Sequence, residues 1–334
     1  MRHPPYRNAL RHLLLLIGLL TAWGCPGGSE RAPTGPPIPL SLAVRPAPDA
    51  ALVAIAQDQG FFKQAGLAVS LTFHSSGREA MAAVCGGQAQ VATVSDVAFA
   101  VKALDDPALR VLAAIGTTTV SQIVARKDRG IRTPADLRGK RVGFSAGTTS
   151  DYFLYAFLLT ENISPDEITA VNIPPARQVD AVVQGEVDAL SAFGPNAFAA
   201  RKRMGDSGLY WDCQNNLAYH WLLATREGAA PSAQALQRLF AALLRAEAFA
   251  IDNDARVQAL LVRQWHLDPE YVRQAWPGTR IRVSFGQSIV SSLRVYFNWW
   301  TRQSAPGHPP VDVVRFLDTG ALDQAAPRLV TLFR

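Results

Sequence analysis

Short apolar runs alternate with longer amphipathic stretches along most of this chain. The short runs are rich in Val, Ile and Leu, which is typical of buried strands, and the longer stretches carry the spacing of helices. Strands are predicted at 39–44, 67–73, 90–94, 110–115, 121–125, 142–144, 168–173, 187–191 and 219–225. Helices are predicted at 50–64, 78–84, 96–104, 133–137, 152–159, 177–184, 196–203, 232–249 (with helical signals to 265) and 289–300. This alternation predicts an α/β fold with mostly parallel sheets flanked by helices.

The predicted elements fall into two lobes. Residues 38–118 and 220–334 are expected to form lobe 1, and residues 119–219 are expected to form lobe 2, inserted in the middle of the chain. The two crossings, each a hinge strand, are expected near 115–126 and 213–225. About 300 residues suffice for two domains with substantial cores.

The N-terminal segment predicts export from the cytoplasm. Three arginines precede the apolar run Leu13–Leu20, as in a signal peptide, which we place at residues 1–24. The following Cys25 resembles the lipidated cysteine of bacterial lipoproteins, although Trp23 departs from the usual pattern, and ordinary cleavage is the alternative. Residues 25–37 are rich in Pro and Gly and are expected to be a flexible tether. We therefore expect a location in the periplasm or at the cell surface, with a lipid anchor in the membrane.

The charge and the cysteines exclude some classes of function. The formal net charge is +6, but without the three arginines of the signal 30 basic residues face 27 acidic ones, which leaves +3. No basic run interleaved with aromatics occurs, so nucleic acid is not an expected partner. No Cys or His pair has metal-ligand spacing, and neither a metal nor a cofactor is expected. Cys85 and Cys213 are either bonded or, the favoured interpretation, two buried thiols.

Two strand-to-helix turns carry the strongest chemical signal. The first lies in Leu71–Met81 and the second in Val142–Leu154. Their hydroxyl residues are Ser75 and Ser76 in the first turn and Thr148, Thr149 and Ser150 in the second. Such residues cap helices, and a helix N-terminus attracts anions and ligand oxygens. Two such turns facing each other across a cleft are typical of a small-molecule receptor, although capping alone explains them about as well.

Other turns add candidates with two interpretations each. Ser95 and Asp96 stand at a third strand-to-helix turn. Asp96 is favoured as a helix cap, and in a cleft it would instead pair with an amino group of the ligand. Thr117 and Thr118 follow a predicted strand beside the first crossing, where they either line the cleft or satisfy a turn.

Several motifs, in order, resemble those of periplasmic binding proteins of the nitrate, sulfonate and taurine type, a group with relatives that bind thiamine pyrimidine precursors. The matching segments are Ala56–Leu67, Ala89–Asp96, Leu137–Gly143, Gly147–Ser150 and Gln184–Leu190. The resemblance implies a two-lobed periplasmic binding protein fold (type II), with a small solute held between the lobes. In Phe193-Gly-Pro the acid of the family's Trp-Glu-Pro-like motif is missing. Phe193 is thus expected to face a less charged or larger solute.

The resemblance implies a solute-binding lipoprotein that delivers a sulfonate, a nitrate-like anion or a small heterocycle to an ABC importer permease. We expect it to act as a monomer. The alternative is a sensor that reports its ligand to a membrane signalling protein. Pyrimidine synthases of similar fold need a histidine and lysine set with an iron-binding cysteine cluster, and this chain has no such motif. An enzyme is therefore not expected.

Overall fold

A computed structural model describes residues 35–213, 217–304 and 306–332. The predicted signal peptide, Cys25 and the first part of the tether lie outside these residues. Within the described ranges, no helix combines the length and the apolar character needed to cross a bilayer.

The described chain contains two sheets. The larger one has the strand order β12-β11-β4-β10-β3-β1-β2, and the smaller one has the order β7-β6-β8-β5-β9. The strands of the larger sheet are β1 (Ile38–Val44), β2 (Leu67–Phe73), β3 (Val91–Ser95), β4 (Leu109–Thr118), β10 (Tyr219–Arg226), β11 (Thr279–Gly286) and β12 (Val330–Thr331). Those of the smaller sheet are β5 (Gln122–Arg126), β6 (Arg141–Phe144), β7 (Thr169–Asn172), β8 (Ala189–Ala192) and β9 (Gly208–Asp212).

The chain passes between the sheets twice, from β4 to β5 and from β9 back to β10. A strand that leaves and a strand that returns run in opposite directions, so β10 pairs antiparallel with β4, and β9 pairs antiparallel with β5. Strands β1, β2 and β3 pair parallel, as do β6, β7 and β8. The α/β class is as predicted, but both sheets are mixed rather than mostly parallel.

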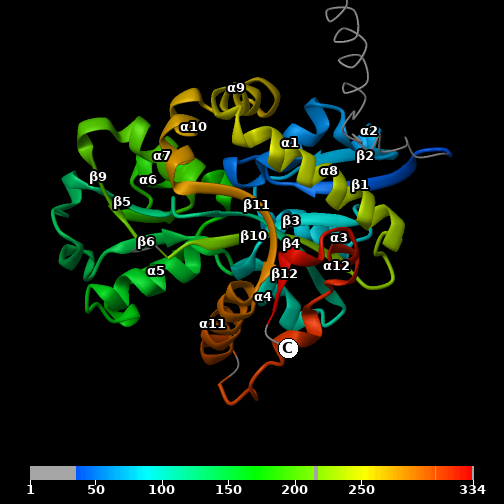
Figure 1. Cartoon of the computed structure of the whole chain (residues 1–334). Helices are drawn as coiled ribbons and strands as arrows, with labels where there is room; N and C mark the ends of the chain where they lie inside the picture. The colour runs from blue at the N-terminus through cyan, green and yellow to red at the C-terminus, as the bar shows by residue number, and fades with distance from the viewer. Residues whose placement is uncertain (1–34, 214–216, 305, 333–334) are drawn as a thin grey trace, which may run out of the picture. The chain divides into compact units, whose positions relative to one another are not determined.

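Helices flank both sheets (Figure 1). Those from the segments of the larger sheet are α1 (Ala51–Asp58), α2 (Phe61–Gln64), α3 (Gly77–Cys85), α4 (Asp96–Asp105), α8 (Ala233–Ile251), α9 (Asp254–Trp265), α10 (Pro269–Ala275), α11 (Gln287–Ser304) and α12 (Gly320–Ala325). Those from the segment of the smaller sheet are α5 (Thr149–Thr160), α6 (Gln178–Gln184) and α7 (Gly194–Met204). The predicted helix at 133–137 is the 3-10 helix Pro134–Leu137, which begins with a capping box formed by Thr133 and Asp136.

Several predicted boundaries were wrong. The helix expected at 50–64 is broken because Gly60 adopts a left-handed conformation with φ 68°, which ends α1 and starts α2. The long helical stretch after Ser232 divides into α8 and α9. Strands β9 and β11 and helix α10 were not predicted at all. Cys85 and Cys213 are free thiols, and Cys213 is buried.

Aromatic side chains join α5 of the smaller sheet to α11 of the larger sheet. The Tyr152 ring lies edge-on to Tyr296 and Trp299, with centroid distances of 4.7 and 5.2 Å. Edge-to-face pairs at such distances contribute beyond simple burial. The two sheets are therefore held together by packing as well as by the chain crossings.

One close backbone approach holds the turn after β1 against β4. A Cβ atom at Gly116 would lie 2.5 Å from the carbonyl oxygen of Asp49 and 3.2 Å from that of Arg280. Asp49 belongs to η1 (Pro48–Ala50), a 3-10 turn that follows β1. Only glycine lets this turn lie against the strand.

We predict that Gly116→Ala lowers the free energy of unfolding by about 1–3 kcal/mol, because the added methyl group forces the turn away from β4. Gly86→Ala is the matched control, since its Cβ would meet the nearest atom at an ordinary 3.4 Å. Urea denaturation of both variants measures the effect. Equal stabilities for the two variants would contradict the close packing of η1 on β4.

Candidate functional site

A small pocket lies where helix N-termini from the segments of both sheets meet the returning strand β10. Its lining residues are Arg45, Ser76, Gly77, Arg78, Ser95, Ala98, Thr148, Thr149, Phe193, Tyr219 and Trp221. They come from the ends of β1 and β8, from the first turns of α3, α4 and α5, and from β10. Its volume is about 20 Å³, which is room for one water molecule.

Three helices point their N-termini at this pocket. Ser76 and Ser95 cap α3 and α4, and each hydroxyl oxygen accepts a backbone N–H at 3.2 Å, from Glu79 and Ala98 respectively. Thr148 caps α5 in the same way and donates its own hydrogen to the carbonyl of Ser145 at 2.7 Å. In the described chain, the hydroxyl hydrogens of Ser76 and Ser95 have no acceptor. Both are therefore free to donate to a ligand.

A buried ion pair forms one wall. Nη2 of Arg45 donates to both carboxylate oxygens of Asp49, at 2.9 and 2.7 Å, and the two residues are only 5% and 3% exposed. Burial opposes the charge on Arg45, but Asp49, Tyr219 and Tyr271 outweigh it and raise the pKa of the guanidinium. Arg45 thus places a permanent cation beside the pocket.

Aromatic rings surround this cation. The Arg45 guanidinium carbon lies 4.2 Å from the Trp221 ring centroid and 5.7 Å from that of Phe193. Trp221 is 3% exposed, and its Nε1–H has no hydrogen-bond partner among the described residues. Its ring lies against Gly77, where a Cβ atom would come within 2.8 Å of the indole. A buried indole N–H normally finds an acceptor, so this one is a candidate ligand contact.

Half of the predicted site residues line the pocket, and the other half lie outside its lining. Those that line the pocket are Ser76, Ser95, Thr148, Thr149 and Phe193. Ser75 is exposed and donates to Glu79 at 2.7 Å. Ser150 bridges α5 to β8 instead, since its hydroxyl donates to the carbonyl of Ser191 at 2.8 Å.

Thr117 and Thr118 were predicted to follow the strand. They belong to it instead, because β4 continues to Thr118. The Thr118 hydroxyl lies 3.4 Å from that of Thr279 on β11. These threonines hold the larger sheet together and do not line the pocket.

Asp96 was predicted to cap α4, but the cap is Ser95. Asp96 does not line the pocket either. Its Oδ2 accepts the backbone N–H of His220 and contacts Nδ1 of the same ring, both at 3.0 Å. Its Oδ1 accepts the N–H of Val97 at 3.0 Å. On the other side of the ring, Nε2 of His220 lies 3.1 Å from the Ser288 hydroxyl oxygen. Asp96 therefore fixes β10 behind the pocket and has no free oxygen to offer an amine.

The residues missed in the sequence are Arg45, Tyr219 and Trp221. Arg45 is a lone charge at the end of an apolar strand, followed by Pro46 and by Asp49 four residues later. Opposite charges four residues apart at the end of an apolar strand indicate a buried ion pair, because a charged side chain is seldom buried without a partner. Nothing in the local sequence around Trp221 tells it apart from a core residue.

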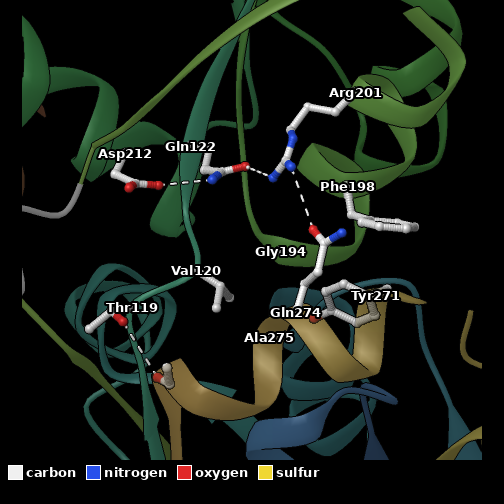
Figure 2. A pocket seen from close by; sticks show the side chains of 11 residues that line it. Thr119, Val120, Gln122, Gly194, Phe198, Arg201, Asp212, Tyr271, Gln274 and Ala275 are labelled. Carbon is white, nitrogen blue, oxygen red and sulfur yellow. Dashed lines mark hydrogen bonds between the residues drawn. The ribbon is translucent and has the colours of Figure 1, made fainter. Parts of the chain in front are cut away.

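A larger hollow of about 240 Å³ lies beside the first crossing (Figure 2). Arg201 donates to Gln122 at 2.9 Å, and Gln122 donates to Asp212 at 2.8 Å. The polar side chains of this larger hollow therefore bond mostly to one another. We place the candidate site in the smaller pocket instead, because helix N-termini and an unpaired buried donor converge there.

Asp151, in the first turn of α5, has an unusual ionisation. Its Oδ2 accepts the N–H of Gly147 at 2.8 Å. Burial raises the pKa of its carboxyl group to about 6, against opposing contributions from Gly147 and Arg78. The folded state therefore binds the proton of Asp151 more tightly than the unfolded state does.

We predict that Asp151→Asn gains stability relative to the native chain as the pH rises from 4 to 7. The native carboxyl must ionise in the folded state over this window, which costs stability, whereas Asn does not ionise. One pKa unit corresponds to about 1.4 kcal/mol, and part of the change lies below pH 4, so the difference should grow by roughly 2 kcal/mol over this window. Chemical denaturation of both proteins at several pH values checks this. A stability difference that does not change with pH would refute the raised pKa.

The chain is similar in sequence and in fold to several known proteins. The chain is 27% identical over 163 residues to the taurine-binding periplasmic protein of Escherichia coli K12, a match that covers 49% of this chain and half of that relative's length. In fold it is similar to the alkanesulfonate-binding protein SsuA of Xanthomonas axonopodis pv. citri bound to MOPS (TM-score 0.72, 16% identity, 86% of this chain and 100% of that one). It is also similar in fold to the desulfurization enzyme DSZB (TM-score 0.63, 18% identity, 87% and 99%). The model of the NMT1/THI5-like family matches residues 47–256, and the chain belongs to that family.

Proposed function

We propose that this protein is the extracytoplasmic solute-binding component of an ABC importer and that it captures a small sulfonate in the pocket between the N-termini of α3, α4 and α5. The convergence of Arg45 with the caps Ser76 and Ser95 carries this proposal. Helix N-termini and a buried guanidinium both stabilise an anion. The similarity to a taurine-binding protein and to an alkanesulfonate-binding protein supports a sulfonate among the possible anions.

The two sides of the pocket must separate to admit a solute, since about 20 Å³ is too small for a sulfonate. We propose that the segments of the two sheets act as lobes, which part by bending at the crossings after β4 and β9. Arg78 on α3 donates to the carbonyl of Ala146 before α5 at 2.5 Å, a contact that this opening would break. Closure around the solute would then present a distinct surface to the importer.

We propose binding rather than catalysis, although DSZB shows that a similar fold also serves an enzyme. The lining residues include no histidine, cysteine or carboxylate to act as nucleophile or general base. The serine and threonine hydroxyls of the pocket serve as helix caps or lie in first turns, and the Tyr219 hydroxyl donates to Asp49 at 3.3 Å. Export and lipidation at Cys25 remain part of the proposal and rest on the sequence alone.

A thermal-shift screen of the chain from residue 35 onward, with nitrate, simple sulfonates, carboxylates and aminopyrimidines, tests the function. A solute that binds only the folded state stabilises it by about 2.7 kcal/mol at a hundredfold excess over Kd. We expect sulfonates to raise the melting temperature. A response to a heterocycle and to no sulfonate would contradict the proposed solute class.

We predict that Ser95→Ala weakens sulfonate binding about tenfold, because it removes a donor to the anion. Ser232→Ala is the matched control, since Ser232 caps α8 with the same 3.2 Å bond and does not line the pocket. Both variants should lose about 1 kcal/mol of stability with the cap. Calorimetric titration separates the two effects. A similar loss of affinity in both variants would assign Ser95 a capping role only.

A further inference from the structure

Among the residues that line the pocket, the polar groups without a hydrogen-bond partner in the described chain are mostly donors. They are the Ser76 and Ser95 hydroxyls, the Nε1–H of Trp221, and Nε and Nη1 of Arg45, for which the described residues provide no acceptor. The hydroxyl of Thr149 can act either way. A group that satisfies such a set must accept hydrogen bonds and donate none. A sulfonate, all of whose oxygens are acceptors, meets that requirement.

The carboxylates near the pocket are already engaged. Asp49 is held by Arg45 and by the hydroxyl of Tyr219, which lies 3.3 Å away. Asp96 is held by His220, and Asp151 accepts the N–H of Gly147. None of the three lines the pocket. An ammonium group on the ligand would therefore enter a site that offers it a neighbouring cation and no acidic partner.

Apart from its partner Asp49, Arg45 is flanked mainly by aromatic side chains. Phe193 and Trp221 flank the guanidinium. An alkyl or aryl tail can pack against these rings, whereas burying an unpaired ammonium there is costly.

We infer that Arg45 and Trp221 hold the sulfonate end of the ligand and that the site selects sulfonates without an amino group, rejecting taurine. This inference rests on the proposed function and goes beyond it, because it assigns the ligand's orientation and excludes the solute of a similar protein.

The test compares taurine with propane-1-sulfonate, in which a methyl group replaces the ammonium, by calorimetric titration of the chain from residue 35 onward. We expect propane-1-sulfonate to bind at least about tenfold more tightly, since the site leaves an ammonium unpaired. Equal or tighter binding of taurine would overturn the selectivity and leave the proposed function intact. If neither sulfonate nor any longer one binds, the proposed function fails, and this inference fails with it.

Two variants test the orientation. Trp221→Phe keeps the ring and removes the N–H, and it should weaken propane-1-sulfonate binding about five- to tenfold. Trp299→Phe is the matched control, because Trp299 also buries an indole N–H without a partner among the described residues and lies on α11, away from the pocket lining. Unchanged affinity in Trp221→Phe, or equal losses in both variants, would remove Trp221 from the site.

Arg45→Gln alone leaves Asp49 buried without its partner and can unfold the protein. The double variant Arg45→Gln with Asp49→Asn removes both charges and keeps the hydrogen-bonding groups. We expect it to fold and to bind propane-1-sulfonate at least about thirtyfold more weakly, as for the loss of a charged donor. Native affinity in this folded variant would show that the helix N-termini alone hold the anion.

Discussion

The buried ion pair between Arg45 and Asp49 is the interaction on which the site depends. It joins the end of β1 to the 3-10 turn η1, and η1 in turn lies against Gly116 of β4. Tyr219 contacts Asp49, and Trp221 stacks on Arg45, so the returning strand β10 is fixed to the same pair. Removing one partner of such a pair leaves an uncompensated buried charge, which is strongly destabilising. One interaction thus sets both the packing of the larger sheet and the charge of the pocket.

The pair also explains how a pocket with a permanent cation stays stable without a ligand. Asp49 uses Nη2 of Arg45 alone, and the neighbouring nitrogens remain available. The cation is neutralised on one side and can donate on the other. An anion of the class we propose would therefore not have to displace Asp49, and the helix N-termini would further stabilise its charge.

Local chemistry was predictable from the sequence, and long-range assembly was not. Ser76 and Thr148 were identified as caps because a cap is defined by its own few neighbours along the chain, although the cap of α4 was assigned to Asp96 and is Ser95. The pairing of Asp96 with His220 spans 124 residues, and no local pattern contains it. Strand β11 was missed although Ile281, Val283 and Phe285 alternate with the polar residues Arg280, Arg282 and Ser284, which is a period-2 signal. The antiparallel pairs β4–β10 and β5–β9 follow from the crossings, and the apolar runs do not encode the direction of a strand.

The contact between Trp221 and Gly77 gives the pocket a fixed depth. The indole lies so close to the first residue of α3 that a single methyl group there would meet it at 2.8 Å. Any larger residue at this position would force the ring or the helix to move. Because Gly77 itself lines the pocket, the lack of a side chain there keeps both the indole in place and this side of the pocket open.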